Sequence, residues 1–162
     1  MMSSLRITQR LALPVLFVLV HACAGWPTDP HGRDLRELER NRRLWESRGV
    51  ANYHYQVANF CFCPEEYRGP IAVEVRNGST LSAVYLAGGG PARSQPFESM
   101  DSVEDLFDTV SRALARDPDE AEVIYDPELG YPRSASFDYE SRAADEEGGF
   151  SVTAFALRGP TN

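Results

Sequence analysis

Polar and apolar residues alternate most clearly in the stretch NYHYQVANFCFCP, which runs from Asn52 to Pro64. Alternation with a period of two predicts a β-strand that is buried on one face. Cα atoms two positions apart in a strand are roughly 6.5 Å apart, near the upper limit for a disulfide. A bond between the two cysteines would therefore need a bend or bulge. The residues expected on one face are Tyr53, Tyr55, Val57, Asn59, Cys61 and Cys63.

Apolar residues that recur with the period of an α-helix predict two amphipathic helices. The first begins with Asp34 as N-cap and Glu37 three residues later, a capping-box pattern, and ends at Gly49. The second begins with the same pattern at Asp101 and Glu104. Its apolar face is formed by Val103, Leu106, Phe107, Val110 and Leu114.

Further strands are predicted from alternation between the helices and after the second one. The first two are joined by Asn77-Gly78, a strong signal for a two-residue hairpin turn. The chain is therefore expected to have an α+β fold of order αβββαβββ, with two helices packed on one face of a mainly antiparallel sheet of about six strands. The similar order of the two halves leaves an internal duplication open. The additional strands are expected at residues 71–76, 80–86, 123–126, 132–139 and 150–157.

The N-terminus has the order of charge and apolar residues that is typical of a secretory signal. Arg6 and Arg10 precede the apolar run at residues 11–20, which is too short to span a bilayer. The sequence VHAC that follows, ending at Cys23, resembles the lipobox of bacterial lipoproteins, although His21 stands where a small residue is usual. The alternative is an ordinary signal peptide that leaves Cys23 as an unpaired thiol.

This resemblance implies a domain organisation and a location. Residues 1–22 are expected to be the signal peptide, 23–33 a linker anchored by lipid at Cys23, 34–158 the α+β domain and 159–162 a tail. Ala24 in place of Asp is similar to lipoproteins that Gram-negative bacteria sort to the outer membrane, so we expect the periplasmic face of that membrane in the cell envelope.

Composition excludes one class of partner. The 162-residue chain has 24 acidic and 16 basic residues and a net charge of −8, so we expect no binding to nucleic acid. The arginines crowd the first predicted helix, where they either face anionic lipid headgroups or pair with the glutamates interleaved among them. The expected partners are the membrane, through the anchor at Cys23, and an unidentified envelope protein or peptide.

Several motifs resemble those of the DUF6174 family, a domain of unknown function found in bacterial exported proteins and lipoproteins. They are YHYQVANFCFCP, VEVRNG, DLF, YDPELGYPRSASFDY and ADEEGGFSV, and together they cover about residues 45–155. The resemblance implies export and an α+β domain but no reaction.

Cys61 and Cys63 are the first candidates for chemistry. With Cys23 assigned to lipid, they are left as a local pair, which we interpret as a structural disulfide in an oxidising compartment. The alternative is a thiol redox or metal-handling protein that uses the same two sulfurs. Catalytic dithiols are typically found at helix N-termini, whereas a strand is predicted here. His54 is predicted to lie on the opposite face, so no metal site and no cofactor are expected.

The second candidate is the segment from Tyr125 to Pro132, YDPELGYP, which combines an Asp-Pro turn with a glycine suited to positive φ. Its tyrosines either pack on the sheet or form an aromatic surface for peptide or glycan contact. The residues of this predicted binding surface are Tyr125, Asp126, Tyr131, Tyr53 and Tyr55. The sequence contains no recognisable catalytic set, and a non-enzymatic binding or accessory module is predicted.

Overall fold

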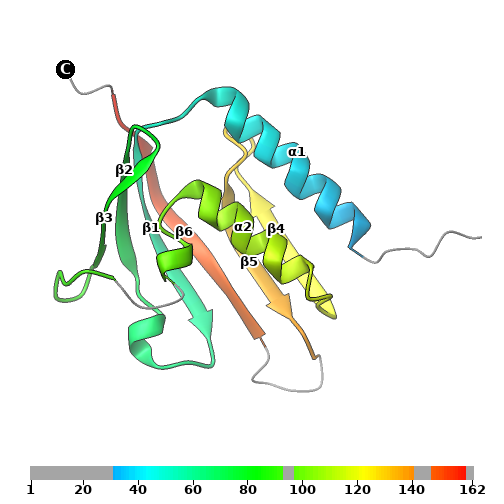
Figure 1. Ribbon diagram of the computed structural model, residues 1–162. Coiled ribbons are helices and arrows are strands. Elements are labelled where there is room, and N and C mark those ends of the chain that lie inside the picture. Colours follow the sequence, from blue (N-terminus) through cyan, green and yellow to red (C-terminus); the bar gives the residue numbers. More distant parts are fainter. Residues whose placement is uncertain (1–30, 93–96, 141–146, 160–162) are drawn as a thin grey trace, which may run out of the picture.

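Strand β1 lies in the middle of a six-stranded antiparallel sheet that has two helices on one face (Figure 1). The computed structural model describes residues 31–92, 97–140 and 147–159. The α+β fold and its element order are confirmed. The elements are α1 Gly32–Arg48, β1 Tyr53–Cys61, η1 Glu65–Tyr67, β2 Ile71–Arg76, β3 Ser79–Tyr85, η2 Phe97–Ser99, α2 Val103–Leu114, β4 Glu120–Tyr125, β5 Pro132–Asp138 and β6 Glu147–Leu157.

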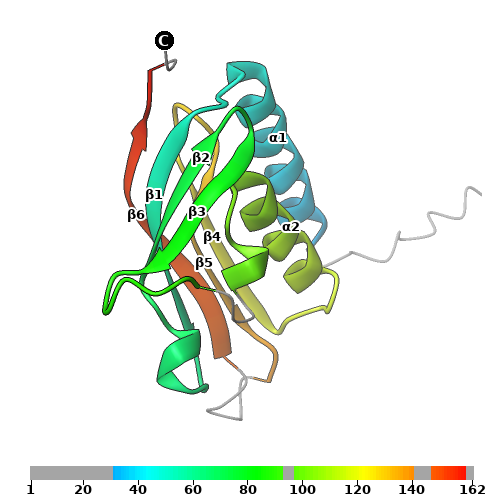
Figure 2. The same ribbon diagram turned by 60° about the vertical axis from the view of Figure 1, so that its left-hand side comes forward.

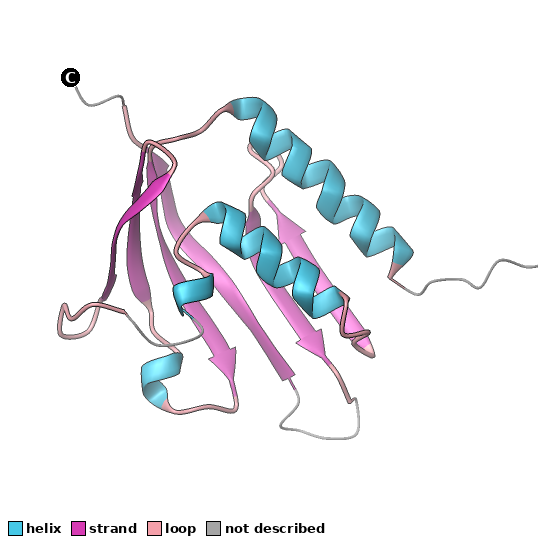
Figure 3. Ribbon diagram, in the orientation of Figure 1, coloured by secondary structure: helices cyan, strands magenta, loops and turns pink. Residues whose placement is uncertain are grey.

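The strand order is β3-β2-β1-β6-β5-β4, so each half of the chain forms a three-stranded meander and the two meanders meet at β1 and β6 (Figure 3). The first strand of each meander lies at the same end of it, so that β1 is central and β4 is at an edge of the sheet. The internal duplication stays a prediction.

The core lies between the helices and one face of the sheet (Figure 2). Tyr53, Tyr55 and Val57 of β1 are at most 1% exposed, as the alternation predicts. Neighbouring strands and both helices add the other buried apolar side chains, among them Ile71, Val73, Val75, Phe137, Phe150, Leu38, Trp45, Leu106, Phe107 and Val110.

Both helices begin at residues other than those predicted from the capping pattern. The N-cap of α1 is His31, whose Nδ1 lies 3.1 Å from Asp34 Oδ2 and whose Nε2 lies 2.8 Å from the carbonyl oxygen of Pro118. The N-cap of α2 is Ser102, whose hydroxyl accepts a hydrogen bond from the Asp105 amide. In α2 the predicted capping pattern is therefore shifted by one residue. Ser102 takes the place of Asp101 as N-cap, and Asp105 takes the place of Glu104 three residues later.

Two strands also depart from simple alternation. In β6, Ala154 has a φ of 50° at a β-bulge, and the extra residue turns Phe155 toward the core in place of Ala154. Strand β4 begins at Glu120, three residues before the predicted start, because Glu120, Ala121 and Glu122 pair with β5. The Asn77-Gly78 turn is confirmed, with both residues at positive φ as a type I′ turn requires.

The predicted signal peptide, Cys23 and the linker up to residue 30 lie outside the described residues. Among the residues that are described, no helix has the length and apolar character needed to cross a bilayer.

Candidate functional site

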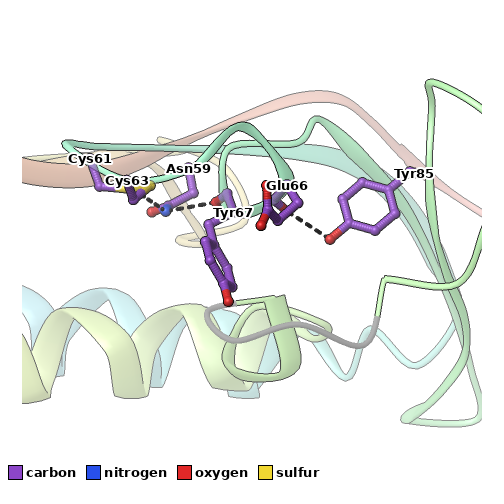
Figure 4. The surroundings of a disulfide bond; sticks show 6 residues. All are labelled: Asn59, Cys61, Cys63, Glu66, Tyr67 and Tyr85. Atoms are coloured by element: carbon purple, nitrogen blue, oxygen red, sulfur yellow. Dashed lines mark hydrogen bonds between the residues drawn. A yellow bond between two sulfur atoms is a disulfide. The ribbon is translucent and has the colours of Figure 1, made fainter.

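Cys61 and Cys63 are joined by a disulfide at the point where β1 ends. Their Cα atoms are 5.2 Å apart, which is shorter than the spacing in an extended strand, so the predicted bend is present. The Asn59 side-chain amide donates hydrogen bonds of 3.0 Å to Cys61 Sγ and to the Tyr67 carbonyl oxygen (Figure 4). The amide thereby connects the disulfide to the loop that leads to β2.

The surroundings of the disulfide combine one cation with two carboxylates, since Arg68 lines the hollow at Cys61 and Cys63. Cys61 ends a strand, and the 3₁₀ turn that follows has three residues and opens with two carboxylates, Glu65 and Glu66. Nucleophilic cysteines are typically found near cations or at the N-terminus of an α-helix, which lower the thiol pKa. Between the cysteines, Phe62 is 87% exposed. The geometry fits a clip that ends the strand.

Because the disulfide closes a very short loop, we expect it to contribute little to stability. The loop-entropy relation gives about 1.5 kcal/mol for a loop of this length. A Cys61→Ser/Cys63→Ser double variant should lose about that much free energy of unfolding in a urea titration. Dithiothreitol should reduce the stability of the wild-type protein and leave the variant unchanged, and a loss above about 3 kcal/mol would contradict a purely local clip.

The YDPELGYP segment forms the turn between β4 and β5. Asp126 Oδ1 accepts hydrogen bonds from the amides of Glu128 and Leu129, at 3.0 and 2.8 Å. The Arg48 guanidinium donates to the Glu128 carbonyl oxygen at 2.9 Å, which joins the turn to the end of α1. The predicted turn chemistry is confirmed, since the Asp side chain binds backbone amides two and three residues ahead.

The five residues predicted as a binding surface do not form one, which corrects that prediction. Tyr53, Tyr55 and Tyr131 are 1%, 0% and 7% exposed, and only Tyr125 and Asp126 are partly accessible. The buried rings pack against Phe155, whose centroid lies 4.1 Å from that of Tyr131 and 5.6 Å from that of Tyr53. Packing on the sheet, the alternative interpretation of these tyrosines, is what the structure shows.

The buried tyrosines keep hydrogen-bond partners, as buried hydroxyls require. The Tyr53 hydroxyl accepts from the Val103 amide at 3.0 Å and donates to Glu104 at 3.3 Å. The Tyr55 hydroxyl donates to the Met100 carbonyl oxygen at 2.6 Å. Burial raises the pKa of both hydroxyls above the usual value, so both tyrosines stay neutral and act as structural links between β1 and the start of α2.

No group of three or more His, Cys, Asp and Glu side chains that could hold a metal ion occurs within residues 31–92, 97–140 and 147–159. His54 belongs to the outer face of β1, opposite to Cys61, as the alternation predicts.

A hollow that the sequence did not reveal lies between the C-terminal half of α2 and the inner face of the sheet. Its volume is about 360 Å³, which is within the range of small-molecule sites. Buried apolar side chains are found next to polar ones in its lining. The lining residues are Asn59, Met100, Thr109, Arg112, Ala113, Arg116, Phe137, Tyr139, Gly148, Gly149 and Phe150.

Two arginines distinguish this hollow. Arg116 lies over the ring of Tyr139, with its guanidinium carbon 4.0 Å from the ring centroid. Arg112 donates a hydrogen bond of 3.0 Å to the Thr109 hydroxyl. Arg112 lies in the last turn of α2 and Arg116 in the turn that follows the helix, and only the topology shows that this end of α2 borders the sheet where β1 ends and β6 begins.

A protein family matches most of the chain. No curated protein matches the chain. The model of a family of unknown function, DUF6174, matches residues 37–157, which include every described helix and strand from most of α1 to the end of β6. The chain belongs to the DUF6174 family.

Proposed function

We propose that this chain is a lipid-anchored protein of the bacterial cell envelope whose DUF6174 domain is a non-enzymatic binding or accessory module. The observation that carries the proposal is the pattern of three cysteines. Cys23 follows a signal-like segment, and Cys61 and Cys63 form a disulfide. Disulfides persist in oxidising compartments such as the periplasm, and a lipobox-type cysteine is the residue that bacterial lipoproteins acylate.

Membrane attachment through Cys23 requires no spanning helix. Two acyl chains hold a protein stably on a bilayer, since each buried methylene contributes about 0.8 kcal/mol. Gly32 begins α1 soon after Cys23, so the domain would lie close to the bilayer surface. The hollow beside α2 supports a binding role, because it combines an apolar floor with polar groups at its rim.

Labelling cells with a palmitate analogue tests the anchor. The wild-type chain should take up the label, and Cys23→Ser should abolish it, because the acylated sulfur is then missing. The Cys61→Ser/Cys63→Ser variant is the matched control and should keep the label, since it removes the other cysteines of the chain. Label that persists in Cys23→Ser, or is absent from the wild-type chain, would refute lipid anchoring. Separation of the two membranes then tests the predicted location on the outer one.

A further inference from the structure

The hollow beside α2 is lined by cationic and apolar groups and by no described acidic residue, although acidic residues outnumber basic ones in the chain by 24 to 16. Arg112 and Arg116 supply its charge. Met100, Phe137 and Phe150 supply an apolar floor, and each is at most 4% exposed.

Four of the other described arginines form ion pairs, namely Arg40, Arg42, Arg43 and Arg76. Arg40 pairs with Glu37 at 3.0 Å, and Arg42 pairs with Asp108 at 2.8 Å. Arg112 and Arg116 belong to the group of described arginines that have no carboxylate within 4.0 Å among residues 31–92, 97–140 and 147–159. Charge at this hollow is therefore not neutralised by the described part of the chain.

The available donors suit an acidic group. A guanidinium carries five N–H donors in a planar fork that matches carboxylate and phosphate oxygens. Arg112 uses one donor on Thr109. Arg116 packs on the ring of Tyr139, a contact that provides none of its N–H groups with an oxygen acceptor. Stacking on the ring also holds Arg116 in place, so less side-chain entropy is lost when an anion binds.

The floor suits a flat apolar body. Phe137, Tyr139 and Phe150 contribute three aromatic rings to a volume of about 360 Å³, and aromatic side chains favour offset or edge contacts with other rings. Gly148 and Gly149 add no side chain on the β6 side, so a planar group can approach the strand.

From these features we propose that the hollow binds a small organic anion, a carboxylate or phosphate ester with a flat apolar body, whose acidic group meets Arg112 and Arg116. The inference deepens the proposed binding role and rests on it. Arg112 also lies in the last turn of α2, where a cation offsets the helix dipole without any ligand, and the experiment must separate that role from anion binding.

Titration calorimetry of the mature full-length chain in nanodiscs, with empty nanodiscs as reference, provides the test. The probes are 2-naphthoate, 2-naphthyl phosphate and the neutral 2-naphthamide. At least one anion should bind about tenfold more tightly than the amide. Whichever anion binds more tightly, the carboxylate or the phosphate ester, then identifies the acidic group that the hollow prefers. Equal affinity for anions and amide, or no binding of either anion, would overturn the proposal.

Variants locate the site. Arg112→Gln/Arg116→Gln should weaken the better anion by about tenfold and leave the weak binding of 2-naphthamide unchanged. The matched control, Arg40→Gln/Arg43→Gln on α1, removes equal charge and should keep wild-type affinity. Thermal unfolding and near-UV circular dichroism test whether both glutamine variants are folded. A third variant, Arg112→Lys/Arg116→Lys, keeps the charge and should recover part of the anion affinity. Wild-type anion affinity in the folded glutamine variant would sink the proposal.

The two proposals fail separately. Absence of anion binding in a chain that still takes up palmitate through Cys23 would overturn only the assignment of this hollow. Loss of Cys23-dependent labelling in a chain that still binds the anion would overturn only the anchor.

Discussion

Replacing Gly149 by alanine is expected to lower the free energy of unfolding by about 3 kcal/mol, at the upper end of the range for overpacking. A Cβ at this position would lie well under 3.0 Å from the Ala135 carbonyl oxygen and 2.7 Å from Cε2 of Phe60. Phe60 faces Gly149 across the β1–β6 pair, and Ala135 belongs to β5 on the other side. The new methyl group therefore meets both neighbouring strands, and the β5 backbone cannot move without disturbing its ladder.

Urea unfolding of the two glycine variants side by side measures this effect. Gly148→Ala is the matched control, because the nearest atom to its Cβ would be the Phe60 carbonyl oxygen at an ordinary 3.8 Å, and its stability should change by less than about 0.5 kcal/mol. Phe60→Ala/Gly149→Ala removes the clash with the ring but keeps the one with the Ala135 carbonyl, so only partial recovery is expected. Equal stability of the two alanine variants would contradict the close approach.

A second large effect is expected for Gly130→Ala, a loss of about 3 kcal/mol in the free energy of unfolding. Gly130 has a φ of +85°, and its Cβ would lie 2.5 Å from the Asn41 carbonyl oxygen of α1. Positive φ alone costs an L-residue about 1–2 kcal/mol, and the clash with the helix backbone adds to it.

Gly88→Ala isolates the cost of placing an L-residue at positive φ. Gly88 also has a φ of +85°, but nothing lies within 4 Å of its Cβ position. This variant should therefore lose only about 1–2 kcal/mol, and the difference between the two substitutions measures the contact between the β4–β5 turn and α1. If both substitutions have the same effect in thermal or urea unfolding, the turn does not press against the helix as described.

The elements could be predicted because their signals are local. Alternation in β1, the Asn77-Gly78 turn and the apolar face of α2 each depend on neighbours in sequence. The bulge at Ala154 has no such signal, since it arises where β6 must match β1 and present Phe155 to the aromatic cluster. Likewise, the first residues of β4 form a strand because β5 provides partners for them.

The candidate site was predictable only in part. The Cys61–Cys63 pair and the Asx turn at Asp126 are each formed within a few residues, so sequence was sufficient. Whether Tyr53, Tyr55 and Tyr131 are exposed depends on which face of the sheet the helices cover, and alternation alone cannot choose that face. The hollow with Arg112 requires the end of α2 to lie beside β1, β5 and β6, a juxtaposition that only the strand order determines.

The meeting of β1 and β6 in the centre of the sheet has a kinetic implication. Tyr53 pairs with Leu157 and Cys61 pairs with Gly148, so the innermost ladder joins residues that are distant in sequence. Proteins dominated by such pairings fold slowly, because a long loop must close before the contacts form. A nascent chain that lacks β6 lacks the strand that joins the two meanders, so the complete sheet forms only after the last strand has been synthesised.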